Sequence, residues 1–179
     1  EMEIRPLIDS DRDEICRILG EVAVFNAQEI WVAIELIDEV LGHPDGEEYY
    51  IFCSLNKGNQ ITGYVTIGPI PLTDGCYDLY WIAVDNKYRG RGVGGELLAW
   101  SENYAMSKGA RRIYVDTSST PAYDPARLFY EKHGYRVECL LKDFYRLGDH
   151  KIVYSKDLPL ATPEKKGRQK PTATLVVSR

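Results

Sequence analysis

Four glycines lie within six positions of this chain, between an apolar run of strand length and a segment with helical periodicity. They are Gly90, Gly92, Gly94 and Gly95. Small residues let a backbone approach a ligand closely, and the free N–H groups in the first turn of a helix attract an anion. Arg89 and Arg91 can balance the charge of that anion. The stretch therefore predicts a strand–loop–helix unit that binds a phosphate group, with a turn that binds nothing as the alternative.

Three kinds of phosphate loop match parts of this stretch. A nucleoside-triphosphate loop continues with Lys and then Ser or Thr, but Glu96 and Leu97 follow here, so this interpretation fails. The dinucleotide fingerprint also matches, with Asp116 about 20 residues further on. However, the five polar residues Asp85–Arg89 precede the first glycine, and only about 60 residues follow Asp116, too few for the second half of that fold. A pyrophosphate bound at the start of a helix is the favoured interpretation.

Hydrophobic periodicity predicts the other elements. Strands are expected at residues 4–8, 49–55, 61–67, 79–84, 112–116, 135–141 and 152–156. Helices are expected at residues 10–19, with Ser10 or Asp11 as the cap, and at 29–41, 93–107 and 124–133. The order β-α-α-β-β-β-α-β-α-β-β is that of one mixed α/β domain over residues 1–158. Residues 159–179 contain Pro, Gly, Gln and Lys and are expected to form a flexible basic tail.

The charge of the chain argues against nucleic-acid binding. The formal net charge is −5, and residues 1–160 alone carry 17 basic and 26 acidic side chains. A surface that binds nucleic acid nonspecifically is basic. We therefore expect no nucleic-acid partner.

Neither a membrane segment nor a metal site is expected. No apolar run approaches the ~20 residues that span a bilayer, and the first five residues lack the layout of a secretory signal. The four cysteines are far apart, which favours reduced thiols in a cytoplasmic protein. His43, His133 and His150 are too dispersed to bind one metal ion.

Two stretches, "IAVDNKYRGRGVGGELL" and "ARLFYEKHGY", resemble the GNAT superfamily of acyl-CoA-dependent N-acetyltransferases. The first resembles the pyrophosphate loop of the family at Arg89, Gly92 and Gly94. The second resembles its later Ala-x-x-x-Tyr-x-x-x-Gly-Phe/Tyr element. It matches at Ala126, Tyr130, Gly134 and Tyr135. The resemblance covers about residues 3–157 and implies a mostly antiparallel central sheet flanked by helices, with acetyl-CoA as co-substrate and no metal.

The resemblance also implies where coenzyme A binds. The diphosphate would lie on the loop from residue 89 to residue 95. The residues concerned are Arg89, Gly90, Arg91, Gly92, Val93, Gly94 and Gly95. The pantetheine arm would enter between two diverging strands, with backbone N–H groups of Ile82, Ala83 and Val84 facing the thioester. Tyr123 stands where the family usually has an asparagine that bonds this arm, so its hydroxyl or its backbone is expected to take over the contact.

Acetyl transfer requires that the amine lose a proton, that the oxyanion find donors and that the thiolate be protonated. Tyr130 matches the general acid of the family, and its alternative is a core tyrosine, because Ala126, Phe129, Tyr130 and His133 share one helical face. Asp78 occupies the place of a glutamate base and could act through a water. Its alternatives are a solvated carboxylate at a strand end and a base made only of water.

The amine acceptor is not named by these motifs. Seven acidic residues and no Lys or Arg lie between Glu29 and Glu48. They form either an exposed helix face or a negative rim that attracts a cationic amine. The predicted activity is transfer of acetyl from acetyl-CoA to a primary amine of a small molecule or peptide. A non-catalytic acyl-CoA sensor is the alternative, and a homodimer through the final strands is possible.

Overall fold

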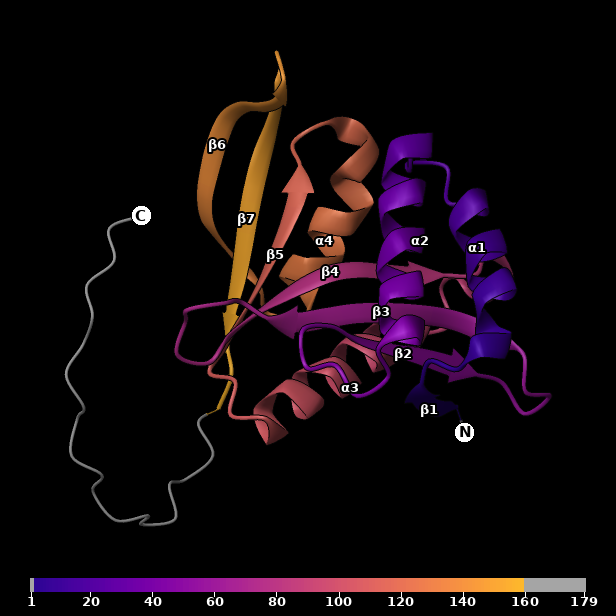
Figure 1. The fold of residues 1–179 in the computed structure, drawn as a ribbon. Coiled ribbons are helices and arrows are strands. Elements are labelled where there is room, and N and C mark those ends of the chain that lie inside the picture. The colour runs from indigo at the N-terminus through magenta and orange to yellow at the C-terminus, as the bar shows by residue number, and fades with distance from the viewer. Residues whose placement is uncertain (1, 160–179) are drawn as a thin grey trace, which may run out of the picture.

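The computed structural model describes residues 2–159, which form a single seven-stranded sheet with helices on both faces (Figure 1). The strands are β1 (Glu3–Pro6), β2 (Tyr50–Leu55), β3 (Ile61–Pro69), β4 (Cys76–Val84), β5 (Arg112–Ser118), β6 (Arg136–Arg146) and β7 (Asp149–Asp157). The helices are α1 (Arg12–Glu21), α2 (Ala27–Gly42), α3 (Val93–Ser107) and α4 (Asp124–Lys132). Three short 3-10 turns are η1 (Asp9–Asp11), η2 (Asn86–Tyr88) and η3 (Pro121–Tyr123).

The strand order is β1-β2-β3-β4-β5-β7-β6, and every neighbouring pair is antiparallel except β4 with β5. Two apolar cores lie on the two faces. In one, Ile15 of α1 and Ile37 of α2 pack with strand residues such as Tyr64. In the other, Leu97 of α3 and Tyr130 of α4 pack over the opposite face. The predicted mixed, mostly antiparallel sheet flanked by helices is confirmed.

The last two strands are longer than the sequence pattern predicts. The pattern places them at 135–141 and 152–156, whereas β6 and β7 continue to a tight turn at Leu147 and Gly148, where Gly148 has a φ of 80°. β6 lies at the edge of the sheet and its side chains are mostly exposed on both faces. An exposed edge strand needs no apolar alternation, so periodicity cannot mark its end.

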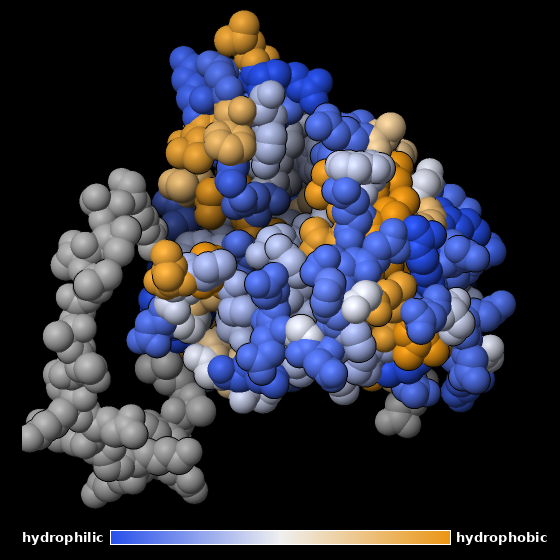
Figure 2. All heavy atoms as spheres, in the orientation of Figure 1, coloured by the Kyte–Doolittle hydropathy of each residue, from blue (hydrophilic) through white to orange (hydrophobic). Residues whose placement is uncertain are grey.

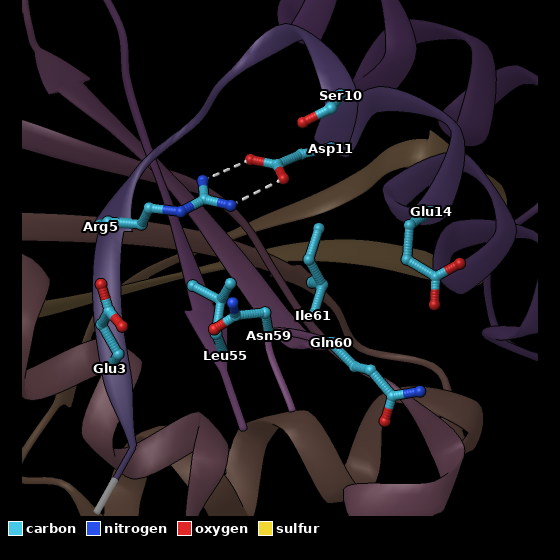
Figure 3. Close-up of a pocket in the computed structure, with 9 residues that line it drawn as sticks. All are labelled: Glu3, Arg5, Ser10, Asp11, Glu14, Leu55, Asn59, Gln60 and Ile61. Carbon is cyan, nitrogen blue, oxygen red and sulfur yellow. Dashed lines mark hydrogen bonds and ion pairs between the residues drawn. The ribbon is translucent and has the colours of Figure 1, made fainter. Parts of the chain in front are cut away.

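The predicted cap of α1 is wrong in its detail. No side chain caps α1, and Asp11 instead accepts a hydrogen bond from the backbone N–H of Ile8 at 3.0 Å. The same carboxylate accepts two hydrogen bonds from the Arg5 guanidinium, at 2.6 and 2.9 Å, beside a cavity of about 670 Å³ (Figure 3). Asp11 therefore fastens β1 to the turn that precedes α1, and the positive charge beside this cavity is already neutralised.

Three further expectations concern features other than the sheet. The expected flexible tail lies, from residue 160 on, outside the described residues. No helix within residues 2–159 is long and apolar enough to cross a membrane. In the same part of the chain, no group of three or more His, Cys, Asp or Glu side chains is placed to hold a metal ion.

Candidate functional site

The sheet divides between β4 and β5. The two strands pair in parallel over three positions only, and the last of these joins Asp78 to Tyr114. Beyond it, β4 stays paired with β3 as far as Val84, while β5 follows β7 as far as Ser118. The β5-facing edge of residues 79–84 therefore has no strand partner within residues 2–159. The predicted divergence of these strands is confirmed, and it leaves a gap edged by free backbone groups.

A β-bulge lies next to this gap. Thr66 of β3 pairs with Trp81, and Ile67 pairs with Leu79, so Tyr80 of β4 is an extra residue. A bulge bends its strand and re-aims the side chains that follow. It therefore contributes to turning β4 away from β5 at this point.

The glycine-rich loop follows β4 and leads into α3. Gly90 and Gly92 have φ angles of 74° and 86°, in the left-handed region that favours glycine. A Cβ atom at either position would meet nothing within 4 Å, so backbone conformation and not space requires these two glycines. Gly92 is the N-cap of α3, and the first backbone bond of the helix runs from the N–H of Glu96 to the Gly92 carbonyl. The N–H groups of residues 93–95 therefore have no partner in the helix.

The other two glycines of the loop allow two helices to touch. A Cβ atom on Gly94 would lie 3.3 Å from the ring of Phe129, and one on Gly95 would lie 2.9 Å from Nε2 of His133. Both neighbours belong to the C-terminal part of α4 and its end. All four glycines were predicted to contact the ligand, and two of them also allow α3 to pack against α4.

Asp85 and Arg17 hold the loop in place, and the sequence analysis missed both. The buried Asp85 carboxylate accepts a hydrogen bond from the N–H of Lys87 at 2.8 Å and forms an ion pair with Arg17 of α1. Arg17 also pairs with Glu14 and Glu21 on its own helix. A lone aspartate after a strand is a recognisable turn signal, but its pairing with a residue 68 positions away is not visible in the sequence.

Asp78 lies at the point where β4 and β5 separate. Burial and, to a smaller extent, the negative charge of Asp116 raise the pKa of Asp78, and Lys151 lowers it, so that the pKa is about 6. Lys151 also forms an ion pair with Asp116 across β5 and β7. A carboxyl group with a pKa near 6 is ionised at neutral pH and still basic enough to accept a proton.

Tyr130 lies in the core beneath the sheet. Its ring contacts those of Phe129, Tyr135 and Tyr154, with centroids 5.5, 5.8 and 6.1 Å apart. Burial alone raises the pKa of the Tyr130 hydroxyl well above that of a free phenol. The group therefore stays protonated at neutral pH. Its burial agrees with a structural role, and its protonation agrees with a proton donor.

Tyr123 lies in η3, just before α4. Its one hydroxyl proton is shared between Oε1 of Glu29, at 2.9 Å, and the carbonyl of Val24, at 3.3 Å, with the carboxylate the nearer acceptor. Burial raises the pKa of Tyr123, and the nearby Glu29 carboxylate raises it further. The hydroxyl thus faces the segment between α1 and α2.

The predicted acidic stretch forms one side of a groove along α2. The groove, of about 700 Å³, is lined by Val32, Glu35, Leu36, Asp38, Glu39, Glu48 and Tyr49. Tyr49 contacts Tyr80 of the bulge edge-to-face at 5.4 Å, which brings the groove close to Asp78. Figure 2 shows a recess between α2 and the β6–β7 hairpin, with both hydrophobic and hydrophilic side chains around its mouth. Asp38 is neutralised by Arg12 of α1 at 2.5 Å.

Comparison with known proteins identifies the family of the chain. The family model described as "Acetyltransferase (GNAT) family" matches residues 12–135. The chain belongs to the GNAT acetyltransferase family.

Solved structures agree with this assignment. A GNAT-family acetyltransferase structure from Desulfovibrio desulfuricans is 35% identical, covering 88% of this chain and 99% of that chain with a TM-score of 0.84. The ribosomal-protein-S18-alanine N-acetyltransferase of Escherichia coli shares the fold at 16% identity, with a TM-score of 0.69 over 94% of this chain and 100% of that one. An aminoglycoside 6'-N-acetyltransferase complexed with coenzyme A also shares the fold, at 16% identity and with a TM-score of 0.69. The match covers 90% of this chain and 99% of that chain. No curated protein matches the chain by sequence.

The matched part of this GNAT acetyltransferase contains every predicted site residue. Asp78 and the edge of residues 82–84 lie on β4, the loop of residues 89–95 leads into α3, and Tyr123 and Tyr130 lie on η3 and α4. The structure brings the loop, the gap and α4 together through the contacts of Gly94 and Gly95. Tyr123 is turned toward α2, and Arg89 and Arg91 are exposed beside the loop.

The pKa of Asp78 predicts how protein stability depends on pH. The folded-state pKa of about 6 exceeds the unfolded value of about 3.9, so the folded state binds this proton more tightly and ionised Asp78 opposes folding above pH 6. Asp78→Asn should therefore raise stability at pH 8 by about 1 kcal/mol after allowance for solvent screening, or roughly 2–4 °C in Tm. Thermal unfolding at pH 8 and pH 4 measures this. A Tm difference from the unmodified protein that is equal at both pH values would contradict it.

Proposed function

We propose that this GNAT acetyltransferase transfers acetyl from acetyl-CoA to a primary amine of a small molecule or peptide, through a domain spanning residues 1–158. One observation carries the proposal. The left-handed N-cap at Gly92 and the three unpaired N–H groups after it lie at the end of the strand whose free edge borders the β4–β5 gap. An anion site and a slot for an extended arm are thus adjacent, as a nucleotide diphosphate that carries a pantetheine arm requires.

The residues present fit coenzyme A. The diphosphate would be held by the N–H groups of Val93, Gly94 and Gly95, with Arg89 and Arg91 on the exposed side. Gly90 and Gly92 have no Cβ atom, and nothing lies within 4 Å of where one would be, so a ligand can approach the backbone closely there. The free edge at Ile82, Ala83 and Val84 offers backbone groups to the arm. Of the two expected contacts of Tyr123, the backbone is available to the arm, because the hydroxyl is bonded to Glu29. Acetyl-CoA would supply the acetyl group as an activated thioester, and the aminoglycoside acetyltransferase with the same fold was solved with coenzyme A bound.

Two side chains then serve proton transfer. Asp78, directly or through a water, accepts the proton that the attacking amine loses as the C–N bond forms. Tyr130 donates its proton to the sulfur as the C–S bond breaks, and recovers it from solvent. The raised pKa of Asp78 and the protonated state of Tyr130 at neutral pH support these two roles.

The groove along α2 supports a cationic acceptor. Glu35, Glu39 and Glu48 line it beside the neutralised Asp38. Such a field concentrates amines that carry a further positive charge. Among the proteins that share the fold, one is named for an aminoglycoside and another for a ribosomal protein as acceptor.

The first experiment measures free thiol released from acetyl-CoA in the presence of neutral and cationic amines. We expect thiol release that depends on the amine, with kcat/KM higher for cationic amines and a preference that weakens as salt is added. Acetyl-CoA binding without thiol release would favour the non-catalytic sensor. A protein that binds a nicotinamide dinucleotide in place of acetyl-CoA would overturn the proposal.

The pH–rate profile tests the two proton-transfer roles. For the unmodified protein, kcat/KM should rise as pH increases through about 6, because Asp78 must be ionised to accept a proton. Asp78→Asn should remove this rise. Tyr130→Phe should lower kcat about a hundredfold with little change in acetyl-CoA affinity. An unchanged profile would exclude Asp78, and an unchanged kcat would leave Tyr130 as a core residue only.

The free edge of β6 supports a homodimer. Val137, Leu140 and Phe144 on β6 are 57%, 52% and 54% exposed, and hydrophobic side chains gather around the β6–β7 hairpin in Figure 2. These half-exposed side chains would supply the apolar part of an interface, and strand pairing along the free edge of β6 would supply the rest of the ~800 Å² that each partner of a stable dimer buries. We propose that two copies associate through β6, in the cytoplasm, where the four free cysteines would stay reduced.

Sedimentation velocity tests the dimer. The unmodified protein should sediment as a dimer at micromolar concentration, and Leu140→Lys should dissociate it, because a charge in the centre of an edge strand opposes pairing. Leu72→Lys is the matched control, since Leu72 is 87% exposed but lies in the β3–β4 connection. A monomeric unmodified protein, or equal effects of the two variants, would contradict the interface.

A further inference from the structure

The segment between α1 and α2 crosses the gap between β4 and β5. The ring of Phe25 packs edge-to-face on Trp81, with centroids 5.2 Å apart, on the part of β4 that has left β5. The preceding residue, Val24, accepts a hydrogen bond through its carbonyl from Tyr123, in the turn that follows β5. Two adjacent residues therefore contact the two sides of the gap.

Glu29 makes the second link across the gap. Its Oε1 accepts the Tyr123 hydroxyl hydrogen bond at 2.9 Å, and its Oε2 accepts from the backbone N–H of Asn26 at 2.8 Å. Asn26 in turn accepts from the N–H of Glu29 at 2.9 Å, which completes a capping box at the start of α2. One carboxylate therefore fixes the first turn of α2 and ties it to η3.

The hydrogen bond between Glu29 and Tyr123 joins α2 to the turn after β5, and these two elements otherwise pack on different parts of the sheet. The apolar face of α2 lies on the core of β2 and β3, on the N-terminal side of the gap. Tyr123 belongs to the C-terminal side, where Arg127 of α4 donates to the carbonyls of Ser118 and Thr120 and steadies the turn after β5. A hydrogen bond to a carboxylate is among the stronger kinds. An asparagine at position 123 would be too short to replace the tyrosine in this contact.

We propose that the Glu29–Tyr123 hydrogen bond positions α2 as the acceptor-side wall of the active site, so that both are positioning residues for the amine. The inference rests on the proposed acetyl transfer. The hydrogen bond holds the groove of α2 at a set distance from Asp78. Breaking it lets the start of α2 move away from the C-terminal half of the sheet, which weakens amine binding without touching the reacting atoms.

Two variants separate this role from simple charge attraction by Glu29. Tyr123→Phe keeps the negative charge but removes the hydroxyl. Glu29→Gln removes the charge but keeps the link, because its amide can donate to the Tyr123 oxygen while its carbonyl accepts from Asn26. If the hydrogen bond positions α2, Tyr123→Phe raises the KM for the amine about tenfold, the factor that corresponds to ~1.4 kcal/mol, and changes kcat little. Glu29→Gln then leaves the KM for the amine nearly unaltered.

The opposite result, a raised KM in Glu29→Gln and a normal one in Tyr123→Phe, would overturn the proposal in favour of direct recognition of the cation. Glu29→Ala should raise the amine KM as Tyr123→Phe does and leave the KM for acetyl-CoA unchanged. The double variant should be no worse than Glu29→Ala, because both changes remove the same bond. Additive effects would count against the link.

Hydrogen exchange gives a measurement that does not depend on activity. Backbone amides of residues 22–30 should exchange faster in Tyr123→Phe and at the normal rate in Glu29→Gln. Ser155→Ala, which loses a hydroxyl–carboxylate bond of 2.7 Å to Glu138 on the outer strands, is the control and should change neither this exchange nor the amine KM. Unchanged exchange in Tyr123→Phe would overturn the link itself, whereas absence of thiol release by the unmodified protein would overturn the proposed function.

Discussion

The arrangement of this protein depends on the short pairing between β4 and β5. Three paired positions are enough to join the two parts of the sheet, and the early end of that pairing leaves an edge of backbone groups inside the fold. Buried backbone groups without partners are costly, so a gap of this kind persists in proteins where another group satisfies them. The bulge at Tyr80 and the separate cores on the two faces stabilise the divergence.

Contacts on several sides of the gap fix the elements that border it. Arg17 and Asp85 fix the end of β4 to α1, and the contacts of Gly94 and Gly95 hold α3 against α4. The segment at Phe25 and Glu29 closes the side that faces α2. The proposed acid and base belong to separate elements, α4 and β4, and their relative position is therefore set by these contacts and not by the local chain.

Much of the fold was predictable from residue patterns, because apolar residues recur with a helical period in amphipathic helices and alternate with polar residues in half-buried strands. The order of elements, and the position of the glycines between a strand and a helix, were predicted correctly. The ends of β6 and β7 were not, since an exposed edge strand carries no such period. The cap of α1 was assigned to the nearest polar residue, whereas Asp11 is used by Arg5. Long-range contacts such as Glu29 with Tyr123 leave no trace in local spacing, and only the folded chain reveals them.

The contact between Gly95 and the His133 ring has a consequence for relatives of this chain. With 2.9 Å between a Cβ atom at position 95 and the imidazole, these two positions share one small volume. A chain that carries alanine or serine at the first must make room at the second, with a smaller side chain or a rotated ring. Positions 95 and 133 are 38 residues apart, and each lies in one of the two sequence motifs of the family. The residues at these two positions are thus expected to vary together.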